Sequence, residues 1–188
     1  MKKIFLIWLS IVLMMLFPFV VKSQNLSNLL QNPEFKSKDN NIPDGWKWFL
    51  DKNVIHIISG ENVNIVEISE DTDKYVPSIC TTLKLDGFKT YQFSVDVKTE
   101  EVSKNAAVYY YWTDANGKEI TKEQYIIKLS GTKDWQTVKK IISPENPAET
   151  KGLKIVLAIY GAKGGKGKVW FKNPCLIEVS QAQEQKKN

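Results

Sequence analysis

The sequence predicts an all-β domain built from two antiparallel sheets, as a β-sandwich or jelly roll. Beyond residue 23, apolar side chains recur with a period of two, which is typical of strands that are buried on one face. Turn-forming residues interrupt the chain at short intervals, and no segment has the periodicity of a long helix. Many short antiparallel strands in one domain need two sheets to bury their apolar faces.

The first 23 residues have the pattern of a secretory signal peptide. Lys2 and Lys3 precede an apolar run over residues 4–21, and Ser23 offers a small residue at a cleavage site. Pro18 and the polar exit from the run favour cleavage, whereas the length of the run leaves an uncleaved membrane anchor as the alternative. We therefore expect a secreted or periplasmic protein that has no membrane contact after cleavage.

Cleavage would leave 165 residues, which is the size of one domain. We place this domain at residues 24–180 and a polar tail at residues 181–188. Three lysines leave with the signal, so the formal net charge falls from +5 to +2, and the chain contains no arginine. Nucleic-acid binding relies on arginine and on a strongly basic surface, so we expect no nucleic-acid partner.

The strands follow from alternation and from the turns between them. Turns are expected at Asp86-Gly87, Asn116-Gly117, Gly131 and the glycine-rich loop at 161–167. In chain order, the strands are predicted over residues 64–69, 78–85, 90–98, 106–113, 136–142, 153–160 and 168–171.

Alternation along the tyrosine-rich strand VYYYW places aromatic rings on both of its faces. Val108, Tyr110 and Trp112 point one way, and Tyr109 and Tyr111 point the other way. The first set is predicted to face the core, so the second set is predicted to be exposed to solvent.

Other strands contribute further outward residues. Tyr91 and its alternate neighbours are predicted to face the core, which leaves Gln92 and Asp96 outward. Tyr160 and Trp170 are outward aromatic residues on two other strands.

Several short motifs follow one another along the chain after the predicted signal peptide. They are NLLQNPEF at 28–35, IPDGW at 42–46, Gly87 followed by YQFSVDVK at 91–98, Asp-Ala-Asn-Gly-Lys at 114–118, Asp134-Trp135-Gln136 and KVWFKNPCLIEV at 168–179. In this order and spacing they resemble the CenC-type carbohydrate-binding modules. Each motif alone is weak, but together they cover nearly the whole chain after the signal peptide and make the resemblance fairly specific.

The resemblance implies a galactose-binding-like jelly roll that binds a polysaccharide or oligosaccharide. Such modules often hold a structural calcium, but the corresponding acidic positions carry Lys36 and Lys172 in this chain. Two ammonium groups would repel the ion, so we expect that this calcium site is lost, with a lysine filling part of its place, and we expect no cofactor. Glu34 and Asn173 are the only nearby oxygen ligands left as weak candidates.

The chemistry of sugar recognition then selects candidate binding residues. Flat aromatic rings stack on pyranose faces, while amide and carboxylate groups bind hydroxyls. Tyr109 and Tyr111 are predicted to form a platform about 7 Å long, with the alternative that these rings cover a second apolar layer or pack under a loop. Gln92 and Asp96 are predicted hydroxyl partners. Further candidates are Tyr160 and Trp170, although both rings are more simply explained by packing.

Other aromatic residues are assigned to structure. Trp46, Trp112 and Trp135 are predicted to lie in the core, from alternation and from the resemblance. His56, the single histidine, lacks a second histidine or a nearby cysteine, so it is a poor metal ligand and a poor catalytic base.

Two alternatives stay open from the sequence alone. Cys80 and Cys175 either form a disulfide or remain separate thiols. The function is either non-catalytic glycan binding or a structural or adhesion role in which the sandwich binds a secreted protein. An enzyme is not expected, because no nucleophile with a positioned base is evident.

Overall fold

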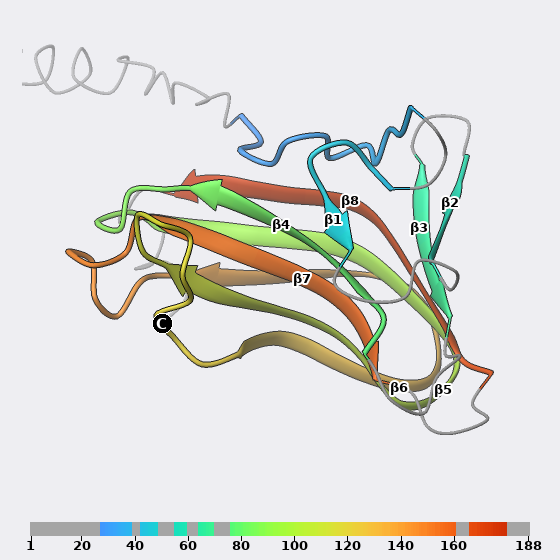
Figure 1. The fold of residues 1–188 in the computed structure, drawn as a ribbon. Coiled ribbons are helices and arrows are strands. Elements are labelled where there is room, and N and C mark those ends of the chain that lie inside the picture. Colours follow the sequence, from blue (N-terminus) through green and yellow to red (C-terminus); the bar gives the residue numbers. More distant parts are fainter. Residues whose placement is uncertain are drawn as a thin grey trace, which may run out of the picture.

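The computed structural model describes residues 27–38, 42–48, 55–59, 64–69, 76–160 and 166–179. Within these ranges the chain forms strands and no helix, so no helix there could span a membrane. The predicted signal peptide and the predicted polar tail lie outside the described residues. The strands are β1 (Lys47–Trp48), β2 (Ile55–Ile58), β3 (Ile65–Ser69), β4 (Ser78–Lys84), β5 (Thr90–Thr113), β6 (Gln124–Ile142), β7 (Gly152–Tyr160) and β8 (Lys168–Val179) (Figure 1).

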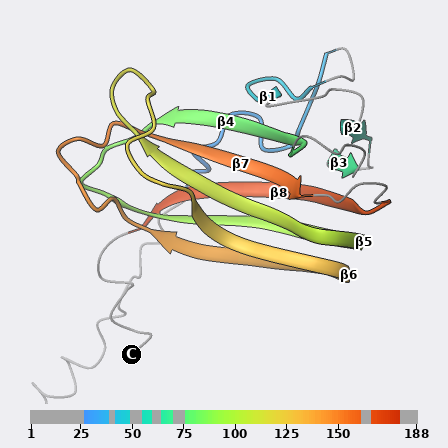
Figure 2. The same cartoon turned by 60° about the horizontal axis from the view of Figure 1, so that its bottom comes forward.

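The strands form an antiparallel β-sandwich in which two long strands belong to both sheets. The first half of β5 pairs with β8 and its second half pairs with β7, while β6 follows β5 along nearly its whole length. All eight strands are hydrogen-bonded in one continuous order, β1-β4-β7-β5-β8-β3-β2, with β6 beside β5. The bend in β5 and β6 curls this sheet into two layers. We call the layer that contains β1, β4 and β7 the β4–β7 sheet, and the layer that contains β2, β3 and β8 the β3–β8 sheet. Figure 2 shows β5 and β6 side by side along one edge.

A bulge at Glu101 carries β5 from one sheet to the other. Glu101 has a φ of 48°, which is the left-handed region, and the register with β6 shifts between Thr99 and Val102. Val102 pairs with Gly131, whose φ of 66° bends β6 at the same level. In Figure 1 both strands curve at the same end of the molecule. The extra residue changes which side of the strand faces the core, because side chains alternate along a strand.

The predicted strands at 90–98 and 106–113 are consequently the two halves of one bent strand. Odd-numbered residues such as Phe93 face the core before the bulge, and even-numbered residues such as Trp112 face it afterwards. The turn predicted at Gly131 is a bend inside β6, not a chain reversal. The alternation predicted within the first half is confirmed by its burial pattern. In the second half Val108, Tyr110 and Trp112 lie in the main core as predicted, but Tyr109 on the other face is also buried.

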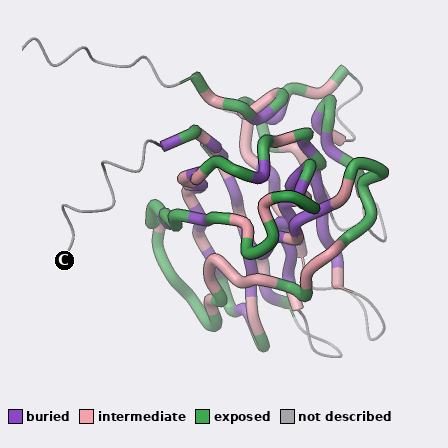
Figure 3. Tube along the Cα trace, turned by 90° about the vertical axis from the view of Figure 1, so that its left-hand side faces the viewer, coloured by how far each residue is buried: buried purple, intermediate pink, exposed green. Residues whose placement is uncertain are grey.

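The inward faces of the two sheets meet in one continuous apolar core. The burial trace shows buried positions running through the strands and exposed positions in the outer connections (Figure 3). Because the inward faces meet, the outward faces of the two sheets lie on opposite sides of the sandwich. The largest fully buried side chains are Trp112, Tyr91, Phe35, Phe93, Phe171, Ile68, Ile79, Leu153, Ile155, Leu157, Ile159 and Leu176.

The two cysteines remain separate thiols. Cys80 lies on β4 opposite Val156, on the outward face of the β4–β7 sheet. Cys175 lies on β8 opposite Ser94, in the β3–β8 sheet. Their positions in different sheets explain why the disulfide that the sequence left open does not form here.

Candidate functional site

Four tyrosines gather on the outward side of the β4–β7 sheet. Tyr109 and Tyr111 come from β5, Tyr125 from β6 and Tyr160 from β7. Tyr109 belongs to a second, smaller apolar cluster that is separate from the main core, together with Cys80, Ala107, Val156 and Ala158, and the other three tyrosines pack against this cluster. We call this surface the tyrosine face.

Tyr109 forms the floor of this face. The prediction that its ring is exposed to solvent is wrong. Its exposed fraction is 5%, and its ring centroid lies 5.8 Å from that of Tyr111, 5.6 Å from that of Tyr125 and 6.4 Å from that of Tyr160. The neighbouring outward positions hold small residues such as Ala107, which leave room for the other rings to pack over it. The three covering rings are each partly exposed.

Glu123, at the end of the loop before β6, joins the three covering rings. Its Oε1 accepts hydrogen bonds from the hydroxyls of Tyr111, at 3.2 Å, and Tyr160, at 3.3 Å. Its Oε2 accepts a hydrogen bond from the Tyr125 hydroxyl. The hydroxyls of Tyr125 and Tyr160 also lie 3.3 Å apart.

This arrangement keeps the tyrosine hydroxyls protonated. Removal from water raises the pKa of Tyr111, Tyr125 and Tyr160 well above the ordinary value of 10.0. The negative charge of Glu123 raises each pKa further. At neutral pH the face therefore presents neutral phenol rings around one carboxylate.

Two lysines lie over the rings of the tyrosine face. The Lys128 ammonium is 3.5 Å from the Tyr125 ring centroid, and the Lys154 ammonium is 5.7 Å from that of Tyr111. Lys154 also forms an ion pair with Glu119, at 2.8 Å. Both lysines are within cation–π distance of a ring.

Gln92, Asp96 and Trp170 lie on the opposite side of the molecule from the tyrosines. They belong to the first half of β5 and to β8, and they point outward from the β3–β8 sheet. The prediction that Gln92 and Asp96 accompany Tyr109 and Tyr111 on one surface is wrong. The residues share a strand, but the bulge at Glu101 separates them into different sheets.

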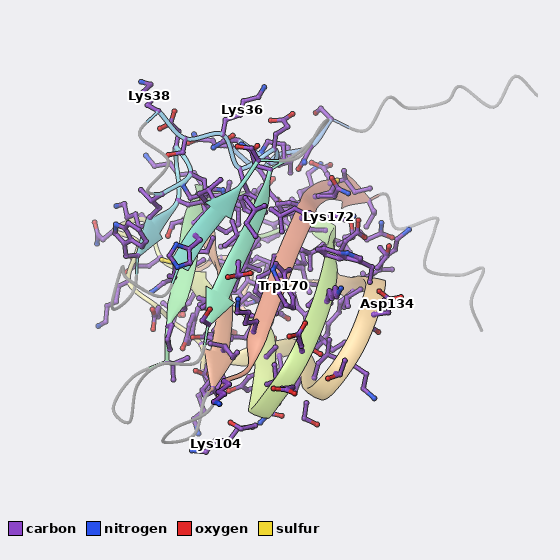
Figure 4. All side chains as sticks on the ribbon, turned by 90° about the vertical axis from the view of Figure 1, so that its right-hand side faces the viewer. Lys36, Lys38, Lys104, Asp134, Trp170 and Lys172 are labelled. Atoms are coloured by element: carbon purple, nitrogen blue, oxygen red, sulfur yellow. The ribbon has the colours of Figure 1, made fainter. Side chains whose placement is uncertain are left out.

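On that opposite face the polar groups are already engaged with one another. Asp96 accepts hydrogen bonds from Thr137, at 2.6 Å, and Asn173, at 2.8 Å. The Trp170 indole donates to Glu67, at 2.7 Å. Figure 4 looks onto this face and labels Trp170 among its neighbours.

The predicted core position of Trp135 is also wrong. The register of β6 shifts between Lys133 and Gln136, which turns Trp135 out of the core. Its ring is partly exposed, and the Lys172 ammonium lies 4.1 Å from the ring centroid. Trp46 and Trp112 are buried, as predicted.

The residues near the expected calcium position do not fit a calcium ion. The Asn32 amide donates to the backbone oxygens of Lys36, at 2.7 Å, and Asp44, at 2.9 Å, so two carbonyls that suit a cation already have a donor. Glu34 is exposed. Lys172 is directed at Trp135, and Figure 4 places it apart from Lys36, so it does not fill the site. Among the described residues, no group of three or more His, Cys, Asp or Glu side chains is placed to hold a metal.

Tyr125, Glu123 and Lys128 were missed from the sequence. Val108 pairs with Ile127 and Tyr109 with Tyr125, so Ile126 is an extra residue that breaks the alternation in this part of β6. The available signal was the Asn-Gly turn at 116–117, because a hairpin there brings the following residues back beside the tyrosine-rich strand.

The chain matches no protein-family model and no curated protein, but it does match solved structures. The enzymatically active domain of tailspike protein 4 of bacteriophage CBA120 has a TM-score of 0.62 at 10% identity, over 81% of this chain and 21% of that one. TmCBM61, in complex with β-1,4-galactotriose, has a TM-score of 0.55 at 16% identity, over 81% of this chain and 99% of that one. A family 16 carbohydrate binding module has a TM-score of 0.54 at 17% identity, over 80% and 100%.

This chain therefore spans about a fifth of the tailspike domain and nearly the full length of both modules. Identities this low are informative about architecture. They show that the chain has a β-sandwich fold of the kind found in carbohydrate-binding modules.

Proposed function

We propose that this chain is a non-catalytic carbohydrate-binding module that acts outside the cell and holds a polysaccharide on its tyrosine face. The observation that carries the proposal is the convergence of three partly exposed tyrosine rings on the single carboxylate of Glu123. The fold it shares with TmCBM61, whose structure contains β-1,4-galactotriose, supports the same reading.

The chemistry of this face suits a sugar. The rings of Tyr111, Tyr125 and Tyr160 offer apolar surface to the C–H faces of pyranose rings, and their hydroxyls offer hydrogen-bond donors and acceptors. Glu123 accepts hydrogen bonds from the tyrosines, and a sugar hydroxyl could replace one of them. Buried Tyr109 supports the three rings from below and makes no ligand contact itself.

The test is affinity electrophoresis in gels that contain xylan, β-glucan, mannan, galactan or pectin. A Tyr111→Ala, Tyr160→Ala double variant is expected to lose about tenfold in affinity for the polymer that retards the wild type, because two stacking surfaces are removed. Trp170→Ala is the matched control, since it removes a partly exposed aromatic ring from the opposite face. Circular dichroism of each variant verifies that the sandwich is intact.

Two results would count against the proposal. If Trp170→Ala abolishes retardation while the double tyrosine variant keeps it, the ligand binds on the β3–β8 sheet. If no polysaccharide retards the wild type and a stoichiometric secreted protein is recovered with it, the structural or adhesion role is correct.

Secretion is tested separately. N-terminal sequencing of this chain, recovered after export, checks the expected cleavage after Ser23.

A further inference from the structure

On the tyrosine face, Lys154 and Glu123 have partners, whereas Lys128 has no acidic partner among the described residues. Lys154 is paired with Glu119, and Glu123 is bound to tyrosine hydroxyls. Lys128 lies over the Tyr125 ring, and no acidic group contacts it among the residues that the structure describes. The register across β6 and β5 places Lys128 opposite Ala107, which offers it no counter-charge.

A second lysine lies at the far edge of the same face. Lys47 on β1 is opposite Cys80, Cys80 is opposite Val156, Val156 is opposite Tyr109, and Tyr109 is opposite Tyr125. This row crosses five strands and is therefore about 19 Å long. Within the described ranges, the lysines that form ion pairs are Lys89, Lys154 and Lys168, and Lys47 is not among them.

On the opposite face, two lysines lie beside acidic residues. Lys168 forms an ion pair with Glu67, at 3.3 Å, and Lys172 lies opposite Asp96 in the pairing of β8 with β5. Lys168 and Lys172 on the β3–β8 sheet thus each lie beside an acidic residue, whereas Lys128 and Lys47 on the tyrosine face have no acidic neighbour in the described part of the chain.

The position of Lys128 affects which sugar can stack on Tyr125. A neutral pyranose would have to displace the ammonium from the ring and would leave it without a counter-charge. A sugar that carries a carboxylate could stack on the same ring and accept a charged hydrogen bond from the displaced ammonium. The second arrangement compensates for the lost cation–π contact, and the first does not.

We propose that the ligand of the tyrosine face is an acidic glycan that contains uronic acid, and that Lys128 binds one of its carboxylates. Lys47, at the other end of the row, is placed to attract a further carboxylate along the same chain. This inference rests on the proposed function, because it identifies the class of ligand for the same face.

The experiment compares each acidic polymer with its carboxyl-reduced form, which keeps the polymer backbone and removes the charge. The probes are polygalacturonate, alginate and glucuronoxylan, and their binding to the full chain is measured by titration calorimetry. We expect binding of at least one acidic polymer and about tenfold weaker binding of its reduced form. Affinity should also fall as salt is raised, because salt screens exposed charges.

Lys128→Met tests the assigned residue, because methionine keeps most of the length of the side chain and removes its charge. It should weaken binding of the acidic polymer about tenfold and leave binding of the reduced form within about twofold. Lys172→Met is the matched control, because Lys172 also lies over an aromatic ring but on the opposite face. It should leave both affinities within about twofold of wild type.

The outcomes separate this inference from the proposed function. If reduced or neutral polymers bind as tightly as acidic ones, or if Lys128→Met binds the acidic polymer like wild type, the acidic-glycan inference is wrong and glycan binding stands. If no polymer of either set binds, both are wrong.

Discussion

The hydroxyl of Tyr160 on β7 donates a hydrogen bond of 3.3 Å to Oε1 of Glu123, which lies next to the start of β6. The strands β7 and β6 do not pair with each other, because β5 lies between them. The contact therefore bridges across β5 and closes the tyrosine face above Tyr109. Glu123 links residues from three strands through its hydrogen bonds to Tyr111, Tyr125 and Tyr160.

Removing this bridge should destabilise the protein as well as weaken ligand binding. Glu123→Ala is expected to lower the free energy of unfolding by about 1–2 kcal/mol, because three hydroxyls lose a charged acceptor. Urea denaturation measures the change. Glu119→Ala, which removes only a partly exposed ion pair with Lys154, should cost at most about 1 kcal/mol. Equal losses in the two variants would mean that Glu123 has no special structural role.

The raised pKa values of the tyrosines predict lower stability in alkali. Folding favours the protonated form of Tyr111, Tyr125 and Tyr160, so this contribution is complete below the unfolded-state pKa of about 10. Above that pH the unfolded chain ionises first, and the free energy of unfolding falls as pH rises. Urea midpoints measured between about pH 8 and pH 11 follow this decline. A Tyr125→Phe, Tyr160→Phe variant should show a shallower decline, and an unchanged slope would contradict the assignment.

Two hydroxyls on β4 provide an internal comparison of satisfied and unsatisfied groups. Ser78 is fully buried, and its hydroxyl has no hydrogen-bond partner in the described structure. The Thr81 hydroxyl donates to the Gly45 carbonyl at 3.0 Å. Ser78→Ala should therefore raise the free energy of unfolding by up to about 1 kcal/mol, while Thr81→Val should lower it by about 1 kcal/mol. Thermal and urea denaturation give both values, and a destabilised Ser78→Ala variant would indicate a hidden partner for the hydroxyl.

Local alternation predicted much of the fold, because burial of one strand face is a property of neighbouring residues. It identified the inward set on each half of β5, including Phe93 and Trp112. It also identified Tyr111 and Tyr160 as outward residues.

The composition of the candidate site could not be predicted in the same way. The outward positions Asp96 and Tyr111 lie on one strand, yet the bulge at Glu101 places them on opposite sides of the sandwich. Exposure of Tyr109 depended on rings that come from β6 and β7, which alternation within β5 cannot reveal. Bulges and cross-strand neighbours are therefore the information that the sequence pattern lacked.

Glu101, at the bulge that separates the two faces, has a left-handed backbone conformation, and substitutions there test its role. A side chain at a φ of 48° is strained, and glycine adopts this conformation without penalty. The backbone N–H of Glu101 donates to Thr132, and glycine keeps this bond. Glu101→Gly should thus be neutral or stabilising by up to about 1 kcal/mol, whereas Glu101→Val should destabilise by about 1–2 kcal/mol, since a β-branched residue tolerates this region least. Urea denaturation of the pair measures the difference, and a valine variant as stable as the glycine variant would show that the bulge is not held in the left-handed conformation.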